Sequence, residues 1–293
     1  MNVFFDTNHS LRPGWKFIIY LAFFFLFWFV FGTALATVVA VMTDGSPPDD
    51  QLTVFALNGV ALAFPAVLAM LFTVRFIDRR PLKIFGVGFL PQWQRHLGAG
   101  LALAAAMLAV LIAGCFAFGY VRIGWTGRQV PLQTLAGTLG VLLLAAANEE
   151  LVFRGFPLQI LIESFGKWPG IVFMSVLFGL LHLKNPNSSI PSTANTILAG
   201  ILLSLAYVRT RSLWFPYGIH IGWNVGLGFI LGFHLSGVDL ASIWTTGISG
   251  RDTILGGDYG PEGGLLATFI FASSAVMVQN WGREPKGIRS KSK

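Results

Sequence analysis

The sequence has few charged residues, few acidic residues in particular, and a single cysteine. Charged residues occupy 11% of its 293 positions, against about 25% in ordinary soluble domains, and 54% of the positions are hydrophobic. This composition excludes an ordinary soluble protein and predicts a polytopic membrane protein. Cys115 lies in an apolar run and has no second cysteine with which to form a disulfide inside the chain.

The net charge of +7 does not indicate a nucleic-acid partner. Lys and Arg occur in short clusters between apolar runs, as is typical of the loops of membrane proteins. No stretch has the composition of a soluble domain, so we interpret residues 1–293 as a single integral-membrane domain. The expected partners are membrane lipids and not nucleic acids.

Eight apolar runs approach the length of about 20 residues with which a helix spans a bilayer. They are 17–42, 52–74, 96–118, 134–157, 169–186, 195–208, 214–233 and 264–281. We therefore predict an all-α fold with about eight transmembrane helices. Two of the runs, 169–186 and 195–208, are short for a full span.

The distribution of basic residues predicts the orientation. With the N-terminus in the cytoplasm, alternating helices leave only four Lys or Arg outside: Arg122, Arg128, Lys184 and Arg251. This agrees with the excess of Lys and Arg in cytoplasmic loops, so both termini are predicted to be cytoplasmic.

Two connecting segments carry further expectations. The outer segment 234–263 is rich in glycine and should be mobile or irregular. The segment 155–167 combines an apolar stripe with charged residues, so we expect it at the inner membrane interface or as a continuation of the preceding helix. Trp93, Trp214 and Trp281 lie near predicted membrane borders and are interpreted as interfacial anchors.

Polar residues within the apolar runs gather in a core at about 134–233. They are Asn148, Glu149, Glu150, Arg154, His182, His220 and Asn224. An ionisable side chain in a spanning segment costs free energy and is a functional candidate for that reason. His9, His96 and His234 lie at helix ends or in loops and are assigned no role.

The spacing on the fourth run separates two carboxylates. Glu150 and Arg154 are four residues apart and meet as an ion pair on a helix. Taken alone, that pair is a structural feature that fixes helix packing, provided that further hydrogen bonds repay its desolvation. Glu149 points about 100° away around the helix, so it cannot share the arginine equally and stays available.

The remaining residues complete a set suited to activating water. His220 and Asn224 share a helix face, and His182 comes from another helix. A carboxylate can take a proton from water, one histidine can orient that water, and a histidine with an amide can stabilise an oxyanion. Glu149, His182 and His220 are equally a plausible zinc set, although no H-E-x-x-H motif is present. Bound zinc and a metal-free mechanism both stay open.

Other functions use the same residues. Glu149 and the histidines are also suited to a proton relay in a membrane transporter. His182 alone would more often be a buried histidine, and Asn224 alone an interhelical hydrogen-bonding residue. The third alternative is a non-catalytic membrane scaffold or immunity protein.

The motifs E-E-x-x-x-R (Glu149, Glu150, Arg154), F-x-x-x-H (Phe178, His182) and H-x-x-x-N (His220, Asn224) occur in this order on successive apolar runs. This order resembles the CPBP intramembrane protease family, which contains the type II CAAX prenyl endopeptidases and bacterial relatives linked to bacteriocin processing or self-immunity. The match covers about 140–230. Arg211 departs from it, standing where glycine is common.

The resemblance implies an intramembrane endopeptidase that cleaves a membrane-anchored or lipidated substrate, prenylated for some relatives. Glu149 would be the general base, His182 would help to bind the water, and His220 with Asn224 would form the oxyanion site. Glu150 and Arg154 would hold the architecture. A multi-pass protein in the plasma membrane of a bacterium is implied.

One geometric difficulty follows for the expected pocket, which we place in the inner half of the membrane, open to the cytoplasm. At about 1.5 Å per residue, His182 lies roughly 20 Å from the inner end of its helix, and His220 only roughly 7 Å. The helix that carries His182 must therefore begin below the boundary, tilt or break.

Overall fold

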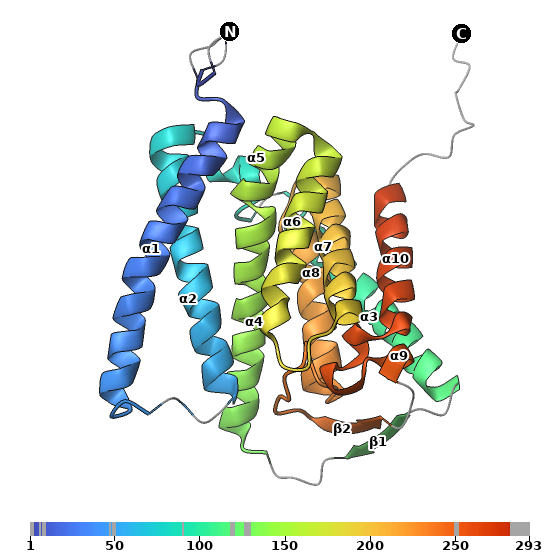
Figure 1. Ribbon diagram of the computed structural model, residues 1–293. Helices are drawn as coiled ribbons and strands as arrows, with labels where there is room; N and C mark the ends of the chain where they lie inside the picture. The colour runs from blue at the N-terminus through green and yellow to red at the C-terminus, as the bar shows by residue number, and fades with distance from the viewer. Residues whose placement is uncertain are drawn as a thin grey trace, which may run out of the picture.

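A computed structural model describes residues 3–5, 7, 10–46, 48, 51–89, 91–117, 121–125, 130–248 and 252–281. Most of the described residues are helical. The helices, shown in Figure 1, are α1 (Pro13–Met42), α2 (Gln51–Phe72), α3 (Trp93–Ala117), α4 (Leu132–Arg154), α5 (Phe156–Phe165), α6 (Lys167–Leu181), α7 (Ile190–Thr210), α8 (Trp214–Asn224), α9 (Asp252–Leu255) and α10 (Leu265–Asn280). A π-helical turn, Val225–Ile230, continues α8, and a 3-10 turn, His182–Lys184, continues α6.

Five helical segments among the described residues are long and apolar enough to cross a membrane. They begin at Pro13, Leu52, Trp93, Leu132 and Ile190, and α10 is a shorter apolar helix. The protein is an integral membrane protein with an all-α fold, as predicted. The count of eight spans and the cytoplasmic position of both termini stay predictions, because α6 and α8 have only 15 and 11 residues.

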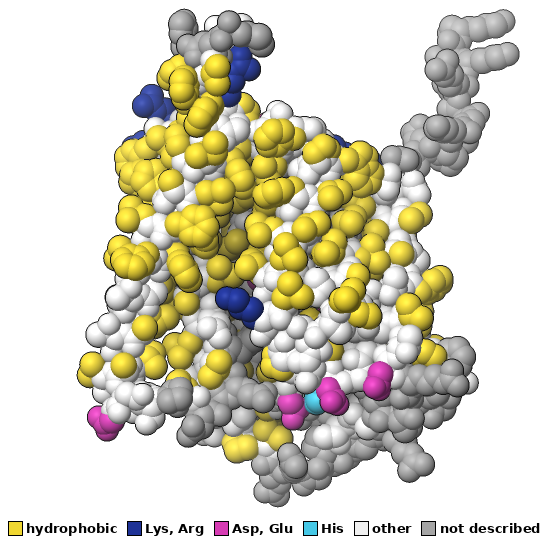
Figure 2. All heavy atoms as spheres, viewed as in Figure 1, with side chains coloured by type: hydrophobic (Ala, Val, Ile, Leu, Met, Phe, Trp, Pro, Cys, Tyr) yellow, Lys and Arg dark blue, Asp and Glu magenta, His cyan; other side chains and the backbone are white. Residues whose placement is uncertain are grey.

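The surface has the polarity of a membrane protein. Figure 2 shows hydrophobic side chains over most of one lateral face, basic side chains near the end where α1 begins, and acidic side chains at the opposite end. Only 6% of the most apolar stretch of α1 is buried inside the protein. On the same helix, Phe29 and Met42 are 69% and 80% exposed. Apolar surface of this extent requires lipid or another apolar partner. Arg128, Arg251, Asp49 and the basic residues after Trp281 lie outside the described residues.

Ion pairs join several helices at the end where α1 begins, called here the basic end. Lys16 of α1 binds Asp78 at 2.6 Å, and Arg80 binds both Asp78 at 2.6 Å and Glu163 of α5 at 2.8 Å. The two acidic partners raise the pKa of Arg80, outweighing the opposite effect of its burial. These pairs fix α5 against α1 and the end of α2.

The segment 155–167 continues the span that begins with α4, because Leu132–Phe165 form one helical segment long and apolar enough to cross a membrane. Gly155 separates α4 from α5, where a Cβ would lie 2.6 Å from the carbonyl oxygen of Leu151. Residues 156–161 of α5 are all buried against neighbouring helices. The apolar stripe therefore packs inside the bundle, whereas residues 163 and 165–167 are exposed. The expected continuation of the preceding helix is confirmed, with a break at Gly155, and the position at the membrane interface stays a prediction.

The glycine-rich connection after α8 is more ordered than expected. Its strand β2 (Trp244–Ile248) pairs antiparallel with β1 (Val121–Trp125) from the connection between α3 and α4. Leu255 and Tyr259 are fully or almost fully buried, at 0% and 2% exposure, and burial raises the pKa of Tyr259 to about 12. The expectation of an irregular segment is confirmed for residues 234–243, which contain only an isolated bridge, and is wrong for the strand, helix and turns described after them. There the glycines allow close packing and turns that composition alone does not predict.

Candidate active site

The Glu150–Arg154 pair lies near the end of α4 and is completely buried. Its side chains are 1% and 0% exposed, and Arg154 Nη1 donates to Glu150 Oε1 over 3.1 Å. The guanidinium also lies 4.5 Å from the ring centroid of Phe178, and its Nη2 donates weakly to the carbonyl of Gly200 at 3.5 Å. The i, i+4 spacing predicted the ion pair within α4. The contacts of Arg154 with Phe178 and Gly200 also connect α4 with α6 and α7.

His220 of α8 contacts both carboxylates. Its Nδ1 lies 2.7 Å from Glu150 Oε1, and its Nε2 lies 3.7 Å from Glu149 Oε2. The carboxylate of Glu150, already paired with Arg154, can only accept a hydrogen bond, so Nδ1 carries the proton. Nε2 is then directed at Glu149.

Glu149 is the available carboxylate of the pair. Its side chain is 27% exposed, and its Oε2 is buried without a hydrogen-bond partner among the described residues. Oε2 of Glu150 and Nε of Arg154 are buried without a partner as well, so what distinguishes Glu149 is that neither of its oxygens is hydrogen-bonded in the described part of the chain and that its side chain is partly exposed. The one-residue offset from Glu150 therefore separates a paired carboxylate from a free one.

His182 lies where α6 ends. Its Nδ1 is 2.7 Å from the carbonyl oxygen of Phe178, which can only accept, so Nδ1 donates and the neutral ring keeps a lone pair on Nε2. Phe178 packs edge-on against Phe153 and contacts the rings of both His182 and His220. It is thus the aromatic spacer between the two histidines.

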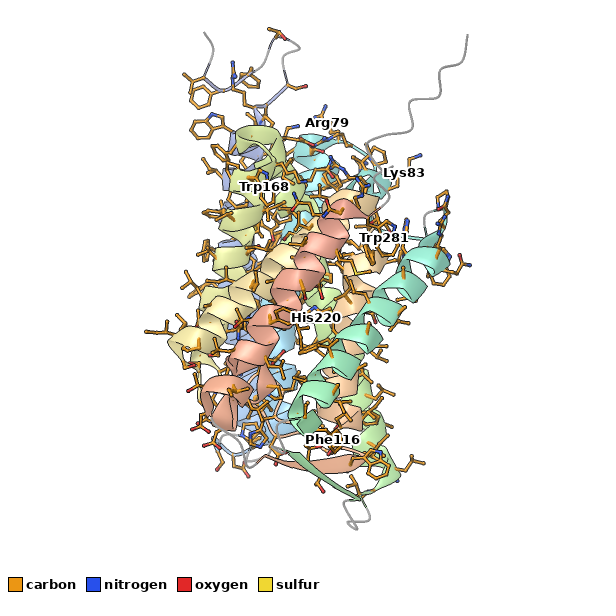
Figure 3. All side chains as sticks on the ribbon, turned by 90° about the vertical axis from the view of Figure 1, so that its right-hand side faces the viewer. Arg79, Lys83, Phe116, Trp168, His220 and Trp281 are labelled. Atoms are coloured by element: carbon orange, nitrogen blue, oxygen red, sulfur yellow. The ribbon has the colours of Figure 1, made fainter. Side chains whose placement is uncertain are left out.

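One cavity of about 70 Å³ is lined by all four predicted catalytic residues, Glu149, His182, His220 and Asn224. It has room for more than one water molecule, since one needs roughly 10–15 Å³. Figure 3 places His220 about midway between Arg79 and Lys83 at the basic end and Phe116 at the other end.

The cavity extends toward the end opposite the basic end, and its expected opening to the cytoplasm stays a prediction. Its wall includes Leu235, Ser236 and Val238 from the connection after α8, which was predicted to lie outside. In Figure 3, Trp168 at the start of α6 lies closer to the basic end than Trp281, which contacts Phe215 at the start of α8 with ring centroids 4.7 Å apart. α8 begins farther from the basic end than α6 does, and α6 ends at His182. His182 and His220 therefore lie close to one another, about midway between the two ends of the bundle.

The sequence of this region matches a known family. Residues 131–226, from the start of α4 to just beyond α8, match the family model described as type II CAAX prenyl endopeptidase Rce1-like. We refer to this matched stretch as the Rce1-like domain. The resemblance drawn from the three motifs is thereby confirmed over this stretch, which contains every predicted site residue.

A bacterial protein is similar to this chain over a longer stretch. An uncharacterized 24.3 kDa protein of Escherichia coli is 26% identical to this chain over 189 residues, covering 60% of this chain and 82% of that protein. The alignment therefore extends beyond the Rce1-like domain itself.

A second carboxylate reaches the cavity from outside the Rce1-like domain. Glu262 accepts hydrogen bonds from the backbone N–H and hydroxyl of Ser236, at 2.6 and 2.7 Å, and from the indole N–H of Trp223 at 2.9 Å. Both oxygens are occupied, so Glu262 closes the cavity and is not a free base. Sequence reasoning assigned it only to an outer loop, and no spacing linked it to the motifs.

The side chains that line this cavity are not arranged as the ligands of a metal ion. Among the described residues, no three His, Cys, Asp or Glu side chains converge in a way that would hold a metal ion. Glu149, His182 and His220 line the same cavity, but only the contact between Glu149 and His220 is close, at 3.7 Å. We derive no step through a metal.

Proposed function

We propose that this protein is an intramembrane endopeptidase that hydrolyses a peptide bond of a membrane-associated protein or peptide. The observation that carries the proposal is the free Oε2 of Glu149, 3.7 Å from His220 Nε2 in a cavity also lined by His182 and Asn224. A carboxylate held free beside two imidazoles is suited to removing a proton from water. The Rce1-like domain supports this class of reaction.

Glu149 acts as the general base. The water oxygen attacks the carbonyl carbon of the scissile bond while Glu149 takes one water proton. When the C–N bond breaks, Glu149 returns that proton to the leaving amine, so that one carboxylic acid and one amine are formed. The same carboxylate thus serves both steps without any net gain of protons.

His182 orients the attacking water. Its Nδ1–H is committed to the carbonyl of Phe178, so the neutral ring accepts through Nε2. A water that donates one hydrogen to Glu149 and the other to His182 has its lone pairs directed away from both, toward the substrate. Orientation of this kind lowers the entropic part of the barrier.

His220 and Asn224 stabilise the oxyanion. The charges of Glu150 and Arg154 cancel. The cluster of Glu149, Glu150, Arg154 and His220 therefore carries one negative charge, on Glu149, when His220 is neutral. Protonation of His220 to the imidazolium brings the net charge of the cluster to zero. In that state His220 donates through Nδ1 to Glu150 and through Nε2 to the oxyanion. The amide of Asn224, one turn further along α8, supplies a second donor.

The substrate class follows from the surroundings of the cavity. The site lies at mid-depth in an apolar bundle, so a substrate must be held in or at the membrane to reach it. We place the protein in the plasma membrane of a bacterium, because a related protein comes from Escherichia coli. A prenylated CAAX-type C-terminus is the first substrate to test, given the description of the matching family.

The direct test is cleavage by the detergent-purified protein. A farnesylated C-terminal peptide is incubated with wild type and with Glu149→Gln, and the released tripeptide is measured by mass spectrometry. We expect release by wild type and a loss of at least about 100-fold in the variant, the usual effect of removing a general base. A chelator-treated sample of the wild type, measured before and after zinc is added back, tests whether release of the tripeptide depends on a metal. Release that is unaffected by Glu149→Gln would refute the assignment of the base.

One observation favours the alternative of a proton-coupled transporter. α6 ends at His182 in mid-bundle, and interrupted helices are common at transporter binding sites. Substrate uptake by vesicles that is abolished in Glu149→Gln, without proteolysis by wild type, would support the transporter. A biological effect unchanged in Glu149→Ala would instead support a non-catalytic scaffold or immunity protein.

A further inference from the structure

A second, larger pocket lies at the basic end of the bundle. Its volume is about 310 Å³, within the usual range for small-ligand sites, and it shares no lining residue with the catalytic cavity. Arg95 and His96 line it from the first turn of α3, and Arg209 lines it from the last turn of α7. Segments more than 100 residues apart in sequence therefore bring three basic side chains to one pocket.

Among the residues that the structure describes, these basic side chains lack acidic partners. No Asp or Glu lines the pocket, and neither arginine nor His96 forms an ion pair with an acidic residue in the described part of the chain. At the same end of the bundle, Lys16 and Arg80 are paired with Asp78 and Glu163. The described residues thus neutralise some cations of this end and leave the two arginines of the pocket without a counter-charge.

A polar atom in the pocket also lacks a partner. Nδ1 of His96 is buried and makes no hydrogen bond among the described residues. Gln92 and Thr210, which also line the pocket, add an amide and a hydroxyl group. The pocket therefore offers charged and neutral donors together, an arrangement that suits an anion with several acceptor oxygens.

The chemistry of the donors favours phosphate. The guanidinium group binds phosphate through two parallel N–H···O bonds, which a single halide ion cannot use. The apolar part of the lining points to a lipid, because Phe215 and Trp281 pack edge-to-face at one side with ring centroids 4.7 Å apart. Basic pockets between helices on the cytoplasmic side are suited to anionic headgroups.

We propose that the pocket lined by Arg95, His96 and Arg209 binds a phosphate group, carried by the headgroup of an anionic phospholipid or free in solution. The site also lies close to the catalytic helix. Phe215 lines the pocket and stands five residues before His220 on α8. A bound headgroup therefore braces α3, α7 and the start of α8 against one another.

The test is a thermal-shift titration of the full-length protein in detergent. The probes are phosphatidylglycerol, zwitterionic phosphatidylcholine and inorganic phosphate, added to wild type, to Arg95→Gln/Arg209→Gln and to Arg75→Gln/Lys83→Gln. The last variant removes the same charge from exposed residues of the basic end that do not line the pocket. Native mass spectrometry counts the bound lipid in parallel, so a variant that melts earlier is still assessed by its binding.

We expect phosphatidylglycerol to raise the melting temperature of wild type and of Arg75→Gln/Lys83→Gln alike, with about tenfold or greater loss of affinity in Arg95→Gln/Arg209→Gln. Stabilisation by inorganic phosphate at equal concentration assigns the site to a soluble phosphate, and stabilisation by phosphatidylglycerol alone assigns it to a lipid. Equal binding by the two double variants, or equal stabilisation by phosphatidylcholine, would overturn the proposal.

Discussion

His220 donates a 2.7 Å hydrogen bond from Nδ1 to Glu150, and this bond joins α8 to the ion pair of α4. The same contact directs Nε2 toward Glu149. Glu150 therefore does more than hold the architecture, the role that the family resemblance implied for it. It fixes which nitrogen of His220 faces the cavity, as outer carboxylates do for histidines in many sites.

Glu150→Gln tests this role of Glu150. The amide oxygen can still accept from His220, but the buried Arg154 loses its counter-charge, which costs about 3–5 kcal/mol of folding stability. We expect peptide cleavage to fall by about tenfold or more. Melting temperature and cleavage rate in detergent measure the two effects. Glu163→Gln is the matched control, because it breaks a half-exposed pair with Arg80 and should cost no more than about 1 kcal/mol.

A double-mutant cycle separates the folding role of the ion pair from its role in catalysis. Arg154→Leu leaves the Glu150 carboxylate buried and is expected to destabilise the fold by about 3–5 kcal/mol. Glu150→Leu/Arg154→Leu removes both charges and should recover much of that stability. Cleavage should not recover, because His220 then lacks its acceptor. Recovery of both stability and cleavage would show that Glu150 does not position His220.

Sequence spacing predicted contacts within one helix better than contacts between helices. The Glu150–Arg154 pair and the shared face of His220 and Asn224 follow from the period of 3.6 residues per turn. The period does not set the level at which one helix stands against the next. For that reason the sequence did not predict how far along the bundle α8 begins and α6 ends, which brings the two histidines together about midway between its ends. The position of the cavity relative to the membrane stays a prediction.

The contacts made by the glycine-rich connection could not be predicted from the sequence. The pairing of β1 with β2 joins residues more than 100 positions apart, and no alternation marked either strand. Glu262 lies outside the three motifs, in a segment whose composition predicted irregular structure. Its position in the cavity depends on hydrogen bonds to Ser236 and Trp223 that only the folded chain brings together.

Glu262→Gln tests whether this residue closes the cavity. The amide has one acceptor oxygen in place of two, so at least one of its three donors loses its partner, at a cost of about 1–3 kcal/mol. We expect hydrogen exchange at the Ser236 amide to rise by roughly tenfold to a hundredfold, since about 1.4 kcal/mol corresponds to tenfold. Exchange mass spectrometry over residues 231–247 measures this. Asp258→Asn, at an exposed side chain of the same connection, should leave the exchange unchanged.

The packing of α8 against α3 offers a test of how the position of His220 depends on the scaffold. A Cβ at Gly100 would lie 2.5 Å from the carbonyl oxygen of Phe215 and 2.7 Å from the N of Ile219, both backbone atoms of α8. Gly100→Ala must therefore push α8 away, and overpacking of this kind costs about 1–3 kcal/mol. His220 moves with α8, so cleavage should fall together with stability.

Gly98 provides the matched control for that substitution on the same helix. No atom lies within 4 Å of a Cβ built there, and alanine is favoured over glycine inside a helix by about 1 kcal/mol. Gly98→Ala should therefore keep cleavage and maintain or raise the melting temperature. If Gly100→Ala were as stable and as active as Gly98→Ala, the close approach of α3 to α8 would not determine the position of His220.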